Sequence, residues 1–126
     1  MSDGTGKRVI VVDDEPLVHE VVGTLLKSRG YDVLSVMSGR ECLQKIYEWV
    51  PALLILDFQM PGLEGNEVFE TLRSKGLLAD IPVIFLSSLS LGQQVEKVPI
   101  SRNVRFLRKP IEPEALLALV AEMIGR

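Results

Sequence analysis

Residues 53–57 read Leu-Leu-Ile-Leu-Asp, an apolar run that ends in a carboxylate. A run that is apolar at every position is typical of a parallel strand covered on both faces. Similar runs occur at 9–12, which reads Val-Ile-Val-Val, and at 83–86, which reads Val-Ile-Phe-Leu. Further runs at 33–36 and 104–107 complete a set of five. The sequence therefore predicts five parallel strands.

The segments between these runs carry apolar residues at every third or fourth position, which is the spacing of an amphipathic helix. The first segment predicts a helix from about 16 to 28, with Gly30 after it as a stop signal. We expect Pro51 to end the second helix and Gly76 the third, and Pro113 to lie in the first turn of the last. The expected apolar stripes are Leu17, Val18, Val21, Val22, Leu25 and Leu26; Leu43, Ile46, Tyr47 and Val50; Val68, Phe69 and Leu72; and Leu116, Leu117, Val120 and Ile124.

Five strand-helix units in 126 residues predict an α/β fold, an open parallel sheet with helices on both faces. The crossover over 90–103 is the poorest, because Pro99 interrupts it, and we expect a short or irregular fourth helix there. The length fits one domain over 1–126, with a core at about 8–124 and no effector domain in the chain. Such sheets place their sites at the carboxyl ends of the strands.

The composition excludes several classes of function. The 14 Lys and Arg against 17 Asp and Glu give a net charge of −3, which disfavours direct nucleic-acid binding. One Cys and one His cannot assemble a four-ligand zinc site. No uncharged apolar run approaches the roughly 18 residues of a membrane helix, and residues 1–8 lack the apolar core of a signal peptide. We therefore expect a cytoplasmic protein without membrane insertion.

Three residue types with distinctive chemistry occur once each, as His19, Cys42 and Trp49. His19 lies off the stripe of the first helix, so we expect it to face solvent. Cys42 is expected to be a small, partly buried apolar side chain of the second helix. Trp49, at the end of that helix, is expected to cover part of the core edge.

Polar residues stand directly after four of the predicted strands. They are Asp13-Asp14-Glu15 after the first, Asp57 at the end of the third, Ser87-Ser88 after the fourth and Lys109-Pro110 after the fifth. Carboxylates gathered in one crevice are driven toward protonation unless a positive group lies among them. Lys109 is one such group, and Mg²⁺, which prefers carboxylate and phosphate oxygens, is another. The pattern indicates a site for a phosphoryl group.

In this order and spacing, the same residues resemble the receiver domain of two-component response regulators. The resemblance spans about 8–124 and also includes Met60-Pro61-Gly62 and Gly65, which follow Asp57. It implies a flavodoxin-like (βα)5 fold with strand order 2-1-3-4-5. It further implies a signalling switch and not an enzyme, a switch that takes part in its own phosphotransfer and autodephosphorylation.

By this resemblance, Asp57 is the phosphoacceptor, and its donor is a phosphohistidine on a sensor histidine kinase or a histidine phosphotransfer protein. Asp13, Asp14, Asp57 and the backbone carbonyl of Gln59 would hold Mg²⁺, with Mn²⁺ as a substitute. Lys109 would pair with one phosphoryl oxygen. The output protein is left unknown, and a homodimer is left open.

The resemblance also implies how the switch is read. The Ser87 hydroxyl would donate to a phosphoryl oxygen and, in moving, vacate space that Phe106 can occupy. Gln59 and Leu89 stand at positions that tune the lifetime of the phosphorylated form, and we expect the apolar Leu89 to hinder the attacking water. The Lys109-Pro110 bond is a candidate cis peptide.

Two alternative functions stay open beside the phosphorylated switch. Residues 90–105 depart from the alanine-rich pattern of the family, which favours a receiver-like module that acts by contact without phosphorylation. An aspartyl-nucleophile phosphohydrolase would use the same Asp, Lys and Mg²⁺. Such hydrolases usually carry Asp-x-Asp after the first strand together with a cap, whereas Asp13 and Asp14 are adjacent and the loops are short. The sequence also leaves open whether the chain acts alone or belongs to a larger protein.

Overall fold

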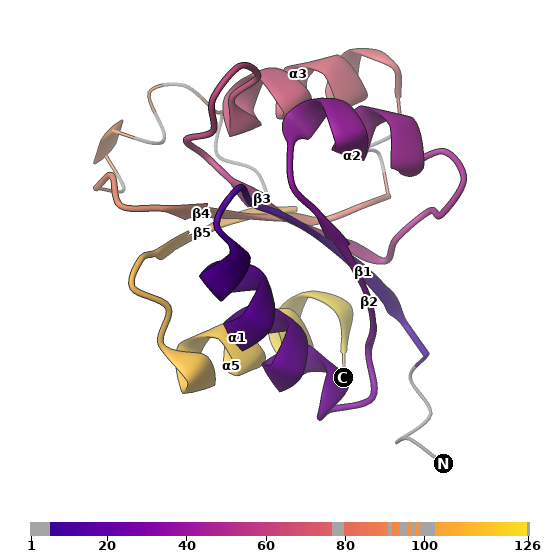
Figure 1. The fold of residues 1–126 in the computed structure, drawn as a ribbon, viewed down its shortest axis with the longest axis vertical. Coiled ribbons are helices and arrows are strands. Elements are labelled where there is room, and N and C mark those ends of the chain that lie inside the picture. Colours follow the sequence, from indigo (N-terminus) through magenta and orange to yellow (C-terminus); the bar gives the residue numbers. More distant parts are fainter. Residues whose placement is uncertain are drawn as a thin grey trace.

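Five parallel strands form the central sheet in the order β2-β1-β3-β4-β5 (Figure 1). The computed structural model describes residues 6–76, 80–90, 92–93, 96, 98 and 103–125. The fold class and the strand order are as predicted. The elements along the chain are β1 (Arg8–Val12), α1 (Pro16–Lys27), β2 (Asp32–Val36), α2 (Gly39–Lys45), β3 (Leu53–Asp57), α3 (Gly65–Ser74), β4 (Val83–Ser87), β5 (Val104–Arg108) and α5 (Pro113–Ile124).

The helices cover both faces of the sheet and divide the core into two layers. In Figure 1, α2 and α3 lie on one face, and α1 and α5 on the other. β3 and β4 are buried at every position, as their uniformly apolar runs predict. Each fully buried Val, Leu or Ile side chain contributes about 1.5–3 kcal/mol of transfer free energy. The two layers therefore hold the central strands rigidly in place.

The strand register brings the ends of β1 and β3 together. Val12, the last residue of β1, pairs with Leu56 of β3 in parallel. The residues that follow, Asp13 and Asp57, therefore stand next to each other at the carboxyl edge of the sheet. On the other side of β3, Asp57 pairs with Leu86 of β4.

α1 spans nearly the predicted residues, but its buried stripe is narrower than predicted. Val22 and Leu26 are buried against the sheet, whereas the side chains of Leu17 and Val21 are 68% and 38% exposed. A helix that packs on a sheet buries only the side chains that point toward the sheet. The predicted apolar stripe also included residues that point to the side. One apolar edge of α1 is therefore left at the surface, close to the carboxyl ends of the strands.

The second helix is shorter than the sequence predicts. α2 ends at Lys45, and Tyr47 and Val50, which were assigned to its apolar stripe, are exposed. The chain turns after Ile46, and by Ala52 it has joined the sheet, where the Ala52 N–H donates to the Arg8 carbonyl at 2.7 Å. The helical spacing of apolar residues in the sequence extends beyond Ile46, although the chain has to turn there to reach β3.

Cys42 and Trp49 both pack against the layer beneath α2. Cys42 is completely buried, more than predicted, and burial raises the pKa of its thiol to about 12. Trp49 covers the edge of this core as expected, and the Arg8 guanidinium lies 5.0 Å from its ring centre. We assign both residues to packing.

The other helices follow the sequence closely. α3 ends at Ser74, two residues before Gly76, which adopts a left-handed φ of 77°. α5 begins with Pro113 in its first turn and buries Leu116 and Val120. The expected short or irregular helix over 90–103 falls largely outside the described residues. Within the described ranges, none of the helices has the length and apolar character that crossing a bilayer requires.

Candidate functional site

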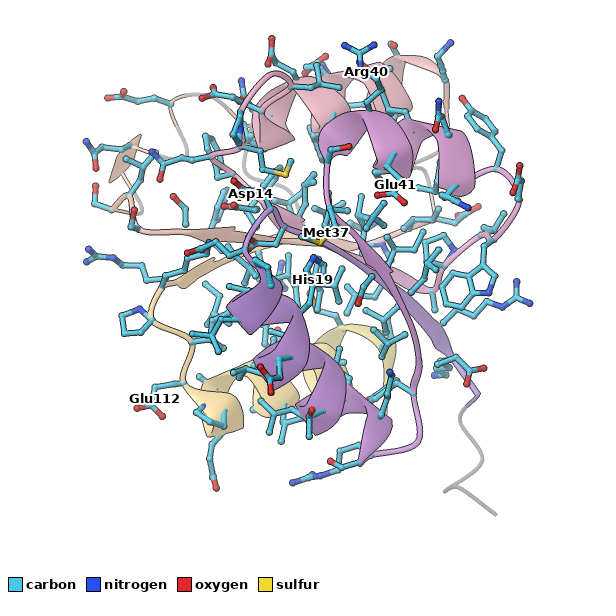
Figure 2. All side chains as sticks on the ribbon, viewed as in Figure 1. Asp14, His19, Met37, Arg40, Glu41 and Glu112 are labelled. Atoms are coloured by element: carbon cyan, nitrogen blue, oxygen red, sulfur yellow. The ribbon has the colours of Figure 1, made fainter. Side chains whose placement is uncertain are left out.

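Three carboxylates meet at the carboxyl edge of the sheet. Asp13, Asp14 and Asp57 each offer an oxygen, and these oxygens lie within 4.8 Å of one another. Asp13 is fully buried and Asp57 is 2% exposed, whereas Asp14 is open to solvent. Figure 2 shows Asp14 at this edge, where β1 gives way to α1. The structure thus brings together the three acids that the sequence analysis singled out.

The backbone holds these acids in fixed places. The Asp13 N–H continues the sheet by donating to the Val36 carbonyl at 3.1 Å, and the Phe58 N–H donates to the Leu86 carbonyl at 2.8 Å. The Gln59 N–H donates to Asp57 Oδ1 at 3.2 Å. The Asp57 side chain is therefore anchored by the turn that follows β3.

Lys109 supplies positive charge to the acidic cluster. Its Nζ lies 2.8 Å from Glu15 Oε1, 3.1 Å from Asp13 Oδ2 and 3.5 Å from Asp57 Oδ2. The Lys109 N–H donates to the Ser87 carbonyl at 2.9 Å, which fixes its backbone beside β4. The Lys109–Pro110 peptide bond is cis.

The electrostatics of the cluster are dominated by burial. Burial and the neighbouring charge of Asp13 raise the pKa of Asp57 from 3.8 to about 7, against the opposing influence of Lys109 and the Gln59 N–H. Burial alone would lower the pKa of Lys109, but its hydrogen bond to Glu15 and the charges of Asp57 and Asp13 raise it above the ordinary value. Lys109 is therefore a permanent cation, whereas burial disfavours the ionised form of Asp57, which further positive charge would stabilise.

The donor set fits a hard divalent cation. Asp13 Oδ2 is buried and lies 3.1 Å from the Lys109 ammonium, beside the carboxylates of Asp14 and Asp57. A cluster of carboxylate oxygens is the environment that Mg²⁺ prefers. The three acids could therefore hold such an ion.

Ser87 is buried next to the cluster and already engaged in hydrogen bonds. Its Oγ accepts the Leu89 N–H at 2.9 Å and donates weakly to Gln59 Oε1 at 3.5 Å. Ser88 Oγ also donates to Gln59 Oε1, at 3.1 Å. The Gln59 side chain thus lies over the two serines. The Leu89 side chain packs against the core instead.

Phe106 lies on the other side of β4 from β3, half-buried. Its ring stacks on Phe85, with ring centroids 5.7 Å apart and an interplanar angle of 16°. Phe85 in turn contacts Phe58 and Phe69, at centroid distances of 5.2 and 5.6 Å. A row of aromatic rings therefore runs from Phe106 to the residue that follows Asp57.

His19 does not face solvent, contrary to the sequence analysis. Its Nε2 lies 2.7 Å from the Asp13 carbonyl oxygen, and its Nδ1 is buried. Helical side chains lean toward the N-terminus of their helix, so His19 reaches back over the first turn of α1. Figure 2 shows it on the side of α1 that faces the sheet. The periodicity of the sequence placed His19 on the polar face of the helix. A periodic pattern carries no information on contacts between a helix and the loop that precedes it.

Two hollows adjoin the cluster. A polar one of about 430 Å³ is lined by Asp14, Glu15, Asp57, Gln59, Ser88 and Lys109. An apolar groove of about 520 Å³ lies beside it, lined by Leu17, Val18, Val21 and Val22 of α1 with Pro110, Ile111, Glu15 and Lys109. Glu15 and Lys109 border both hollows. In the sequence, Glu15 is the third acid after the first strand, and its position alone predicted no role for it.

The doubly wound sheet and its acidic edge put the chain in the class of α/β domains of receiver type. A family model described as "Response regulator receiver domain" matches residues 9–121. The chain belongs to this family and is a receiver domain of the two-component response regulators.

Individual relatives agree with this assignment. Protein PilG of Pseudomonas aeruginosa is 31% identical over 115 residues, which cover 91% of this chain and 85% of PilG. The DNA-binding dual master transcriptional regulator RpaA of Synechocystis is 32% identical over 121 residues, 94% of this chain but only 49% of RpaA. The chain thus spans about half the length of several curated relatives that it matches. Chemotaxis protein CheY4 of Vibrio cholerae has a solved structure with a TM-score of 0.85 at 26% identity, covering 93% of this chain and 98% of its own.

Proposed function

We propose that this receiver domain is a phosphorylation switch in which Asp57 accepts the phosphoryl group. The observation that carries the proposal is the setting of Asp57. It is buried at the end of β3, within 3.5 Å of the Lys109 ammonium, and it borders a polar hollow of about 430 Å³. A buried acid with a strongly raised pKa in a polar cleft is a candidate for chemistry and not for surface solvation.

In the proposed transfer, an Asp57 carboxylate oxygen forms a bond to phosphorus. The bond between phosphorus and the donor breaks, and the leaving group, a histidine nitrogen or an acetate oxygen, keeps the electron pair. Lys109 is placed to pair with a phosphoryl oxygen, because its ammonium already lies among the acids. Autodephosphorylation would be the attack of water on the same phosphorus, with Asp57 as the leaving group.

Asp13, Asp14 and Asp57 are the residues that would hold Mg²⁺, and the Gln59 carbonyl stays a prediction. When bound, the cation would neutralise charge on the acids and on the phosphoryl oxygens as they meet. The burial of Asp13 Oδ2, which Lys109 Nζ approaches to 3.1 Å, and the short separations within the cluster support this assignment. Mn²⁺ as a substitute and the cytoplasmic location also stay predictions.

The proposed readout runs through Ser87 and Phe106. To donate its hydroxyl to a phosphoryl oxygen, Ser87 has to give up its weak donation to Gln59 Oε1, while its Oγ can still accept the Leu89 N–H. A movement of Ser87 toward the phosphoryl group would draw the loop after β4 with it through the Leu89 N–H, and Phe106, which stacks on Phe85 and is only half-buried, would then shift inward. The proposed lifetime roles of Gln59 and Leu89 belong to the same loop.

The apolar groove supports a protein as the phosphoryl donor. Receiver domains interact with histidine kinases, and here the exposed side chains of Leu17 and Val21 continue into a groove that reaches Lys109. A helix of a histidine kinase or phosphotransfer protein could bury this apolar surface and present its phosphohistidine to Asp57. A homodimer stays a possibility that the sequence left open, and no output protein is assigned.

The test is the intact mass of the protein after incubation with acetyl phosphate, with and without Mg²⁺. We expect one phosphoryl adduct that requires Mg²⁺ and is absent from Asp57→Asn. Asp32→Asn, which changes an exposed acid at the start of β2, should behave as the parent does. A folded parent without an adduct would contradict the proposal and favour a module that acts by contact alone.

A further inference from the structure

Glu15 makes the shortest contact of the Lys109 ammonium. Its Oε1 lies 2.8 Å from Lys109 Nζ, closer than the nearest oxygen of Asp13 or Asp57. The contact joins the loop after β1 to the loop after β5, across 94 positions of sequence. The Lys109 ammonium, which is proposed to pair with the phosphoryl group, is therefore held by Glu15, a residue outside the three acids proposed to bind the metal.

The Glu15 carboxylate does not cap α1. Glu15 occupies the N-cap position, where a side chain often accepts a backbone N–H of the first turn, but it makes no such bond. Its backbone N–H donates to Asp13 Oδ1 at 2.9 Å, so the main chain of Glu15 is fixed while its side chain extends to Lys109. Of these two possible roles, capping α1 and pairing with Lys109, the Glu15 side chain performs only the second.

Glu15 is also the partner that Lys109 can lose most easily. The Glu15 side chain is 58% exposed, whereas those of Asp13 and Asp57 are 0% and 3% exposed. A buried carboxylate cannot leave its ammonium without a large desolvation cost, but an exposed one can swing into water. An anion that enters the polar hollow would therefore displace Glu15 first.

We propose that Glu15 is a specificity-determining residue that holds Lys109 in the unphosphorylated protein and disfavours small, highly charged phosphodonors. This inference rests on the proposed function of Asp57. Glu15 and Lys109 both line the polar hollow, so an incoming phosphoryl group competes with Glu15 for the ammonium and is repelled by its charge. A protein donor with a basic side chain next to its phosphohistidine could pair with Glu15 and release Lys109.

The test compares Glu15→Gln with Glu20→Gln, which removes an equal charge from an exposed position of the same helix. Phosphorylation rates are followed by intact mass with acetyl phosphate, at Mg²⁺ concentrations that saturate each variant. We expect Glu15→Gln to react about five-fold faster than the parent at low ionic strength, because one repelling charge is lost near the phosphorus. The gain should shrink at high salt, which screens that charge. Glu20→Gln should match the parent.

A second donor separates charge selection from a structural effect. Phosphoramidate carries less net negative charge than acetyl phosphate at neutral pH, so its rate should rise less in Glu15→Gln. Glu15→Ala, which cannot accept a hydrogen bond from Lys109, should show at least the same acceleration. If Glu15 had only a structural role, its replacement would slow phosphorylation by both donors equally.

The outcomes separate the two proposals. If the parent is phosphorylated at Asp57 but Glu15→Gln and Glu15→Ala react no faster, the role of Glu15 is overturned and the proposed function stands. Equal acceleration with both donors also overturns selection by charge. If the parent itself gains no phosphoryl group with either donor, the proposed function has failed, and the role of Glu15 fails with it.

Discussion

Asp57 is buried beside a second carboxylate, and both features raise its pKa, to about 7. In the unfolded chain the same group has its ordinary pKa of 3.8. Between these values the folded protein holds a proton that the unfolded chain has released. Stability from this group is therefore fully present below about pH 4 and is lost as the pH rises through about 7.

This linkage predicts the effect of Asp57→Asn on the free energy of unfolding without Mg²⁺. At pH 8 the amide removes the cost of a buried charge, so the variant should be more stable than the parent by on the order of 3 kcal/mol. At pH 4 the two should differ much less, because Asp57 is then protonated in the folded protein. Urea unfolding in the presence of a chelator measures both values.

The exposed acid Asp32 provides the control, and Asp32→Asn should show no comparable change between the two pH values. A gain for Asp57→Asn that is the same at pH 4 and pH 8 would mean that ionisation of Asp57 is not its source.

At the scale of single elements, α3 depends on how closely it approaches the end of β3. The Gly65 N–H donates to the Phe58 carbonyl at 3.0 Å. A Cβ at Gly65 would lie 2.3 Å from the Asp57 carbonyl oxygen and 2.9 Å from Phe58 Cα, which are both backbone atoms. Glu64 and Glu67 complete a capping box at the same end of the helix. α3 therefore begins directly on the backbone of the proposed phosphoacceptor.

Gly65→Ala should accordingly push α3 away from β3. We expect a loss of on the order of 2–3 kcal/mol in the free energy of unfolding, since backbone cannot yield as a flexible side chain can. Phosphorylation should also slow under conditions in which the variant is fully folded, because the Asp57 carbonyl is displaced. Urea unfolding and intact mass measure the two effects.

Gly23→Ala in α1 is the matched control. A Cβ there meets nothing within 4 Å, and alanine favours the helix by about 1 kcal/mol over glycine. This variant should be as stable as the parent or more stable. A Gly65→Ala protein that matches Gly23→Ala would refute the close approach as the reason for glycine at 65.

At the scale of the whole molecule, the acidic cluster would couple the proposed metal binding to folding. Its acids come from the ends of different strands, so only the folded chain brings them together. Mg²⁺ at about ten times its Kd should add about 1.4 kcal/mol to the free energy of unfolding and raise the Tm by about 4 °C. Asp13→Ala should lose most of this rise, as followed by thermal unfolding.

Asp32→Ala, outside the cluster, should keep the full response to Mg²⁺. If Asp13→Ala responds as strongly as the parent, the ion binds elsewhere on the protein. Either result is independent of phosphorylation, so it tests the proposed metal site by itself.

Much of the fold follows from local patterns. The uniformly apolar runs at β3 and β4 and the glycine and proline signals around the helices each depend on a few neighbouring residues. Parallel strands joined by right-handed crossovers must present their carboxyl ends at one edge. For this reason the sequence predicted that Asp13, Asp57 and Lys109 would gather.

The sequence by itself therefore determined the strands, the α/β class and the edge where the acids meet, because periodicity and chain connectivity are local or topological properties. Only the tertiary structure decided which side of α1 is buried, where α2 ends, that His19 reaches the Asp13 carbonyl, and that Lys109 rests closest to Glu15. It also decided that burial beside Asp13 raises the pKa of Asp57 to about 7. Those features depend on distances and on the exclusion of water between segments far apart in the chain, and no local pattern contains either quantity.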